Sequence, residues 1–254
     1  MDFYISWVLN TVPIYKIIAF KYLKLIVDNR QNTLLRPSSW LDPHEMNYSR
    51  SVLGTEHGDI SLDGSHWFGQ SWSLCEENVL MWQSFKKEMK EPYVKIKVKP
   101  NSLVAGLNKK DSSLRICALD YIRYFHSSTA DYVEKIKEVQ EVQFRPQNFI
   151  AYGAKLEELY PIYSLLTKRD IFMYEEEVRL LLFDKSSTPD LEFIRYDFNP
   201  ELIEEVIIDP WTSDNKVNEI SDYLRSKISN PNLKIEKSNI FGDSFKYATR
   251  YTIK

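Results

Sequence analysis

The chain has 254 residues, of which 43% are hydrophobic and 27% are charged. These fractions are typical of a globular protein and exclude a disordered, collagen-like or coiled-coil chain. The 33 lysine and arginine residues are balanced by 36 aspartate and glutamate residues, which gives a formal net charge of −3. This balance argues against a surface that binds a nucleic-acid backbone throughout, although a local basic groove stays open. The length suits one large core, so we predict a single domain over 1–254.

The first 13 residues form an apolar N-terminal segment ahead of a core expected over 14–240. The segment lacks the basic start of a secretory signal, and Pro13 interrupts it before the roughly 20 apolar residues of a bilayer span are reached. We expect a packed helix up to Asn10 or a segment that binds a partner protein, and no membrane span. The two cysteines, Cys75 and Cys117, lie far apart in the sequence. They exclude a disulfide framework or a Cys-based zinc site and predict a reducing, cytoplasmic location.

Hydrophobic periodicity predicts a mixture of strands and helices without regular alternation. Such a mixture indicates an α+β fold with a mostly antiparallel sheet and flanking helices. Neither a Gly-x-Gly-x-x-Gly sequence nor a Walker loop is present, which argues against Rossmann or P-loop nucleotide binding. In chain order we predict a strand over 14–17, a helix over 20–29, a strand over 33–36, a polar surface loop over 47–66, a strand over 67–73, a helix over 80–89, strands over 93–98 and 114–125, a helical stretch over 154–168 that Pro161 starts anew or kinks, strands over 176–183, 191–196 and 206–208, a helix over 217–228 and a strand over 233–237.

An acidic block late in the chain, Glu175-Glu176-Glu177-Val178-Arg179, is the first candidate for chemistry. If the block is a strand, Glu175, Glu177 and Arg179 share one face, and the two carboxylates lie about 7 Å apart. Their repulsion raises one pKa unless Arg179 or another cation compensates. The block is either a solvated strand face with an Arg-Glu pair or a pair of carboxylates held at a cleft, where one can bind a ribose hydroxyl or act as an acid or base.

Two further sets of polar residues precede this block. Asp42, His44 and Glu45 lie in a loop after the second predicted strand, where they are candidate metal ligands, and Asp42 is equally a candidate cap or turn residue. Ser71 and Ser73 share one face of the strand over 67–73 and can hold a ligand or a backbone group. A serine-hydrolase assignment fails because no histidine lies a short step away and no nucleophile elbow is present.

The order of these motifs resembles the bacterial family known as domain of unknown function 2971. The resemblance covers residues 14 to 240 and rests on five blocks, namely Tyr15-Lys16, Trp40-Leu41-Asp42-Pro43-His44-Glu45, Ser71-Trp72-Ser73, Lys168 and Tyr174-Glu175-Glu176-Glu177-Val178-Arg179. The chain departs from the family at Ile17, at Trp40-Leu41, at Ser71-Trp72 and in the insert around 47–66. At a coarser level the layout resembles ADP-ribosyltransferase-like toxins, which place a basic residue on an early strand, serines on a middle strand and Glu-x-Glu on a late strand.

This second resemblance implies an enzyme that uses NAD as a substrate and needs no metal. It implies catalytic carboxylates at Glu177 and, as second candidate, Glu175. Residues that would bind NAD are Tyr15, Lys16, Arg36, Ser71, Ser73 and Tyr174. Among them Arg36, or alternatively Lys16, would hold the pyrophosphate, and Tyr174 or Trp72 would stack on the nicotinamide.

The resemblance further implies a toxin or antiphage effector that modifies a nucleic acid or a protein, with an antitoxin or partner bound through the N-terminal segment. Two alternatives stay open. One is a metal-dependent nuclease built on Asp42, Glu45, Glu175 and Glu177. The other is a non-catalytic binding or regulatory module of a defence system, which the apolar N-terminal segment favours.

Overall fold

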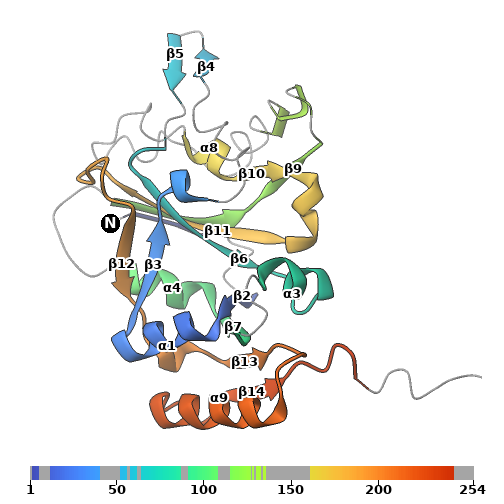
Figure 1. The fold of residues 1–254 in the computed structure, drawn as a ribbon. Helices are drawn as coiled ribbons and strands as arrows, with labels where there is room; N and C mark the ends of the chain where they lie inside the picture. Colours follow the sequence, from blue (N-terminus) through green and yellow to red (C-terminus); the bar gives the residue numbers. More distant parts are fainter. Residues whose placement is uncertain are drawn as a thin grey trace, which may run out of the picture.

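The computed structural model describes residues 2–5, 12–40, 52–55, 58–61, 64–86, 91–107, 115–126, 128, 130–132, 134–135 and 161–242. A ten-stranded sheet dominates this part of the chain (Figure 1). Its main path runs β1-β8-β11-β6-β2-β7-β13-β14, and β3 joins β6 and carries β12. Its strands are β1 (Asp2–Ile5), β2 (Ile14–Ala19), β3 (Gln31–Leu35), β6 (Trp67–Ser73), β7 (Tyr93–Val98), β8 (Arg115–Tyr121), β11 (Glu177–Asp184), β12 (Phe193–Asp197), β13 (Glu205–Ile208) and β14 (Lys234–Lys237).

Most neighbouring strands of the sheet are antiparallel. Within the described sheet, the parallel pairs are the two at its ends, β1 with β8 and β13 with β14. Two small ribbons lie outside the sheet, namely the antiparallel pair β4 (Val52–Thr55) and β5 (Gly58–Ser61) and the parallel pair β9 (Arg123–Phe125) and β10 (Thr167–Arg169). The predicted α+β fold with a mostly antiparallel sheet is therefore confirmed.

Helices cover both faces of the sheet. The larger core lies under α1, α4 and α9, whose buried residues Leu23, Leu103 and Leu224 belong to one hydrophobic cluster with Val178, Leu180 and Leu182 of β11. A smaller core on the other face joins Met81 and Trp82 of α3 to Ile17 and Ala19 of β2. The helices are α1 (Phe20–Asn29), α3 (Val79–Phe85), α4 (Pro100–Leu107), α8 (Pro161–Leu165) and α9 (Asp214–Lys227), with 3-10 turns η2 (Pro37–Ser39), η3 (Asp170–Glu175) and η4 (Pro200–Leu202).

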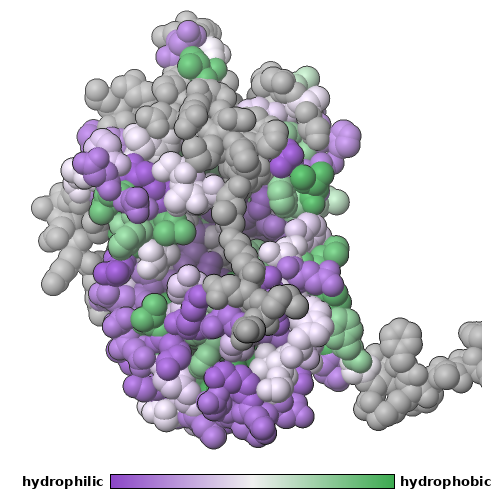
Figure 2. Space-filling view, in the orientation of Figure 1, coloured by the Kyte–Doolittle hydropathy of each residue, from purple (hydrophilic) through white to green (hydrophobic). Residues whose placement is uncertain are grey.

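The outer surface follows the same division of side chains. Figure 2 shows mostly hydrophilic residues over α9 at the bottom of the view. Helix α9 buries Ile220 and Leu224. Its basic residues Arg225 and Lys227 lie in the last turn, where their positive charges interact favourably with the negative end of the helix dipole. Within the described residues, no helix is both long and apolar enough to cross a bilayer. Cys75 and Cys117 are both free thiols.

Many predicted elements agree with the structure to within a few residues. The structure has a helix at Phe20–Asn29 and strands at Trp67–Ser73 and Tyr93–Val98, with the predicted bounds. The break expected at Pro161 is also present, because α8 begins at that residue, where proline fits the first turn of a helix.

Three of the predicted elements were wrong, and one helix was missed. The N-terminal segment forms a strand, Asp2–Ile5, rather than the beginning of a helix up to Asn10. The loop over 47–66 contains the hairpin of β4 and β5. The helical stretch ends at Leu165, and Thr167–Arg169 is a strand. A helix, Pro100–Leu107, was not predicted at all. The predicted single domain over 1–254 stays a prediction.

Candidate active site

Two acidic and two basic side chains form a buried cluster beside the centre of the sheet. Lys168 Nζ lies 2.6 Å from Glu175 Oε2 and 2.9 Å from Glu177 Oε2. On the other side of Glu177, Arg179 Nε lies 2.8 Å and Arg179 Nη2 2.7 Å from Oε1. Glu177 is 2% exposed and Arg179 1% exposed. The cluster thus holds two carboxylates and two cations almost out of water, which is stable only because the charges are paired.

The register of the sheet places this cluster opposite the serine-rich strand. In the pairing of β11 with β6, Glu177 faces Ser73 and Arg179 faces Ser71. Directly paired residues point to the same face of a sheet, so both serines lie on the face of the cluster. The exposed Ser71 forms a side-chain hydrogen bond with Glu177. The buried Ser73 donates to the backbone oxygen of Glu175 at 2.7 Å and therefore positions the turn.

The cluster keeps Glu177 ionised. Burial on its own raises the pKa of the Glu177 carboxyl, but the charges of Arg179 and Lys168 and the hydrogen bonds from Ser71 and Lys168 outweigh it and lower this pKa to about 2. The sequence left open whether one pKa rises or a cation compensates. Compensation by Arg179 and Lys168 is what the structure shows.

Glu175 reaches the cluster from a turn rather than from the strand. It is the last residue of η3, and Glu176 follows with φ 43°, a left-handed conformation that reverses the chain before β11 begins at Glu177. The strand alternation predicted through Glu175 was therefore wrong. The expected neighbourhood of the two carboxylates exists nonetheless, because both bind the ammonium of Lys168.

Aromatic side chains and backbone groups close the cluster. The hydroxyl oxygen of Tyr124 accepts the N–H of Glu177 at 2.8 Å, and the backbone oxygen of Leu165 accepts Arg179 Nη1 at 2.6 Å. The centre of the Trp40 ring lies 4.3 Å from the Arg179 guanidinium carbon, an attractive cation–π arrangement. Trp40 can lie there because position 69 is glycine, where an added Cβ would come within 2.6 Å of the indole.

Lys16 lies at a split in the sheet. Strand β2 pairs with β6 through one residue pair, Tyr15 with Ser73, and β3 pairs with β6 through Leu35 with Gly69. Between these two points the backbone oxygen of Ser71 accepts the ammonium of Lys16 at 2.9 Å. Burial lowers the pKa of Lys16 to about 8, against an opposing effect of the Glu177 charge. The early cation and the late carboxylate are therefore electrostatically coupled.

Arg36 contacts backbone oxygens and an aromatic ring at the edge of the sheet. Its guanidinium donates to the backbone oxygens of Leu191 at 2.7 Å, Thr188 at 2.7 Å and Ser65, and its carbon lies 4.9 Å from the centre of the Phe68 ring. These contacts fasten the loop before β12 to the start of β6. The pyrophosphate-binding role of Arg36 stays a prediction.

The two tyrosines that were predicted to bind NAD, Tyr15 and Tyr174, lie in different elements and make different contacts. Tyr15 is buried, the centre of its ring lies 4.4 Å from Lys95 Nζ, and burial raises its pKa to about 12. Its register partner is Ser73, so Tyr15, Ser73 and Glu177 form one row across three strands. Tyr174 belongs to η3, and its hydroxyl lies 3.0 Å from that of Ser84 in α3.

Sequence reasoning did not place four members of the site. Lys168, Arg179, Tyr124 and Trp40 were absent from the predicted site residues, although Lys168 and Trp40 stand in the blocks of the family resemblance and Arg179 was named as a compensating cation. Tyr124 had no signal, because its contact with Glu177 is made across 53 residues. Asp42 and Glu45 lie outside the described residues.

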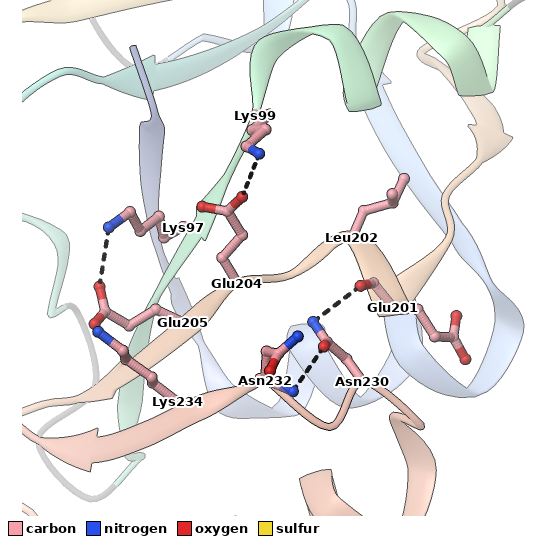
Figure 3. Close-up of a pocket in the computed structure, with 9 residues that line it drawn as sticks. All are labelled: Lys97, Lys99, Glu201, Leu202, Glu204, Glu205, Asn230, Asn232 and Lys234. Carbon is pink, nitrogen blue, oxygen red and sulfur yellow. Dashed lines mark hydrogen bonds and ion pairs between the residues drawn. The ribbon is translucent and has the colours of Figure 1, made fainter. Parts of the chain in front are cut away.

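A cavity of about 400 Å³ lies elsewhere, where β7, β13 and β14 meet (Figure 3). Its charges are largely paired with one another, with Lys97 3.8 Å from Glu205 and Lys99 3.3 Å from Glu204. None of the predicted site residues lines it. Among the described residues, no three His, Cys, Asp or Glu side chains gather as a metal site.

Comparison with models of protein families and with curated proteins finds no match, so the resemblance to domain of unknown function 2971 stays a prediction. Among solved structures, the chain is similar to DarT of Thermus sp. 2.9 in complex with NAD+, at 12% identity and a TM-score of 0.40, covering 91% of this chain and 98% of that one. For the complex with carba-NAD+ the identity is 10% and the TM-score 0.38, and the alignment covers 91% of this chain and 98% of that one. For the complex with ADP-ribosylated single-stranded DNA the identity is 12% and the TM-score 0.38, and the alignment covers 88% of this chain and 93% of that one. Scores of this size do not establish a shared fold.

Proposed function

We propose that the chain is an ADP-ribosyltransferase-like enzyme that transfers ADP-ribose from NAD to a nucleic acid or a protein. The observation that carries the proposal is the state of Glu177. It is a buried carboxylate, kept ionised by Lys168 and Arg179, bonded to an exposed serine and coupled to the ammonium of Lys16. NAD and ADP-ribosylated DNA are also the ligands of the DarT complexes, which adds nothing to the argument at their level of similarity.

The chemistry needs such a carboxylate. When the bond between nicotinamide and ribose breaks, positive charge develops on the ribose, as in glycoside cleavage. A carboxylate fixed in advance near this ribose stabilises the charge without having to reorganise. Because the pKa of Glu177 lies far below neutrality, its negative charge is present throughout the physiological pH range. Glu175, which shares Lys168 with it, is the second candidate for this role.

The remaining roles go to residues around the split in the sheet. The ammonium of Lys16 would pair with the pyrophosphate of NAD, and the exposed Ser71 hydroxyl would orient the nicotinamide ribose. Tyr15 and Ser73 would support the strands on either side, while Tyr174 would stack on the nicotinamide. Arg36 is the alternative pyrophosphate ligand, and its binding would compete with its present backbone contacts.

We further propose that the enzyme acts as a cytoplasmic toxin or antiphage effector and that an antitoxin or partner binds the N-terminal segment. Strand β1 supports this second part, because it lies at one end of the strand order of the described sheet. A terminal strand can accept a strand from another chain.

The test compares Glu177→Gln with Glu176→Gln. Glu176 is the next residue along the chain but is exposed, so its variant is a matched control for the loss of one carboxylate. Protein is incubated with labelled NAD and cell extract, and label on DNA, RNA and protein is measured beside a circular-dichroism melting curve. We expect wild-type and Glu176→Gln to label an acceptor, and Glu177→Gln to lose at least about 100-fold in rate while still folded. Labelling by folded Glu177→Gln at the wild-type rate would refute the assignment.

The two alternatives are separated by simple measurements. For the nuclease, the structure offers an unfavourable observation, because the ammonium of Lys168 occupies the place between Glu175 and Glu177 that a divalent metal would take. Nuclease activity that a chelator abolishes would nevertheless establish it. For the binding module, the expected result is no labelling and no rise in melting temperature with NAD.

A further inference from the structure

A histidine–aspartate pair lies next to the acidic cluster and plays no part in it. His126 follows β9 and Asp170 follows β10, and His126 Nδ1 lies 2.6 Å from Asp170 Oδ2. The side chain of His126 is 87% exposed and that of Asp170 31%. Such a pair on a surface contributes little to stability, so a role in folding does not account for its geometry.

The pairing of β9 with β10 relates this pair to the cluster. The two strands are parallel, with Tyr124 opposite Lys168 and Phe125 opposite Arg169. His126 is the first residue after β9 and Asp170 is the first residue of η3, so they lie two positions after Tyr124 and Lys168 in the chain. Those two residues contact Glu177 directly, through the hydroxyl oxygen and the ammonium.

The contact with Asp170 fixes the proton on the imidazole. An ionised carboxylate only accepts hydrogen bonds, so Nδ1 of His126 must carry the hydrogen. In the neutral ring the lone pair then lies on Nε2. Within the described part of the chain, Nε2 makes no hydrogen bond, and the ring is open to solvent. A base held in one tautomer, with its lone pair presented to solvent, can take a proton from a bound molecule.

We propose that His126, oriented by Asp170, is the catalytic base that removes a proton from the acceptor, so that the acceptor atom is an N–H or O–H nucleophile rather than one that is already ionised. This inference rests on the proposed transfer of ADP-ribose. The acceptor would approach between the dyad and Glu177, on the side of the nicotinamide ribose away from the leaving group.

The step balances in atoms and electrons. The bond between the ribose C1′ and the nicotinamide nitrogen breaks, and its electron pair stays on that nitrogen, which makes nicotinamide neutral. The lone pair of the acceptor nitrogen or oxygen forms the new bond to C1′. The proton of the acceptor passes to Nε2 of His126, and the carboxylate of Asp170 stabilises the imidazolium until the proton leaves to water.

The experiment separates NAD binding from transfer. Binding of carba-NAD+ is measured as the rise in melting temperature, and transfer as the label moved from NAD to an acceptor in cell extract. For His126→Ala we expect the rise in melting temperature of wild-type and a transfer rate lower by at least about 100-fold, partly restored by added imidazole. The control is His66→Ala. His66 contacts Ser187 at the turn before β6, and its variant should transfer at the wild-type rate.

The dependence of transfer on pH adds a readout that a structural role would not move. The charged groups that act on His126 are Asp170 in η3, through a hydrogen bond and through its charge, and Asp131 in the following segment. The wild-type rate should rise with pH through the titration of His126, because only the neutral ring accepts a proton. The Asp170→Asn variant should move this rise to lower pH, since the charge of Asp170 raises the pKa of His126.

Each result decides between the two proposals. If wild-type neither binds carba-NAD+ nor transfers label, the proposed function fails and the dyad proposal fails with it. If wild-type does both and His126→Ala transfers at the same rate with the same pH profile, the base assignment is overturned while the enzyme assignment stands. If folded His126→Ala no longer binds carba-NAD+, the base assignment is also overturned, because His126 would then be needed to bind NAD.

Discussion

The ammonium of Lys168 and the carboxylate of Glu177 lie 2.9 Å apart, although nine positions and a 3-10 turn separate them in the chain. The turn brings the end of β10 back over the start of β11. This return makes a buried negative charge possible at Glu177, because Arg179 alone would leave Oε2 without a cationic partner in the cluster.

Stability should fall in acid because of Glu177. The cluster lowers the pKa of this residue from 4.5 to about 2, so the folded protein binds the proton less readily than the unfolded chain. The stabilisation is complete above the unfolded value and is lost as the pH falls from about 5 to 2, in total about 3 kcal/mol. Urea unfolding of wild-type and Glu177→Gln at several pH values measures it. If the difference in unfolding free energy between wild-type and Glu177→Gln stays constant from about pH 5 to 2, the prediction is contradicted.

Asp120 should act in the opposite direction. It lies opposite Arg179 in the pairing of β8 with β11, is fully buried, and its Oδ2 makes no hydrogen bond to the described residues. Burial raises its pKa from 3.8 to about 6 against the opposing charge of Arg123, so its contribution is present below about pH 4 and is lost as the pH rises to about 6. Asp120→Asn should be more stable than wild-type at pH 7 by up to about 3 kcal/mol. Urea unfolding of wild-type and Asp120→Asn at pH 4 and pH 7 checks this. A difference in unfolding free energy between the two proteins that is the same at both pH values would contradict it.

Binding of NAD should weaken in alkali because of Lys16. The pKa of Lys16 is about 8, so the ammonium is charged below this pH and neutral above it. We expect the affinity for carba-NAD+, measured by calorimetry, to fall about tenfold between pH 7 and 9.5, since a charge-assisted hydrogen bond is worth about 1.5–3 kcal/mol. Lys16→Met should bind weakly at both values. An unchanged affinity in wild-type would remove Lys16 from the binding site.

Trp40 should need a glycine at position 69 to keep its ring beside Arg179. At Gly69 an added Cβ would come within 2.6 Å of the indole and 2.9 Å of Leu181. Gly69→Ala should displace the ring from Arg179 and lower the unfolding free energy by about 2 kcal/mol, with a change in tryptophan fluorescence. Gly54→Ala is the control, because its Cβ would meet Asp59 at an ordinary 3.6 Å. Gly69→Ala that unfolds like wild-type would show that Trp40 is not held there.

The sequence predicted those parts of the fold that local patterns determine. Alternation and apolar runs located β6, β7 and β11, and helical spacing located α1. The turn at Glu175 was missed because three consecutive glutamates continue an apparent strand pattern, whereas the left-handed Glu176 ends it. Two partners of Glu177 could not be predicted, because Lys168 and Tyr124 reach it only through a second ribbon, β9 with β10.

The two predicted cations show the same limit. Lys16 and Arg36 both follow the order that the family resemblance implies, yet the structure couples Lys16 to Glu177 and commits Arg36 to backbone oxygens. The choice between them depends on where β2 and β3 leave β6, which local sequence does not encode.

The main-chain oxygen of Ser71 has a consequence for the design of inhibitors. It accepts the ammonium of Lys16 at the edge of β6 between the two contact points of β2 and β3. A compound carrying its own amine could displace Lys16 and take this oxygen as its anchor. Since a carbonyl of the peptide backbone persists through every side-chain replacement, resistance by point mutation at the anchor itself would be hard to evolve.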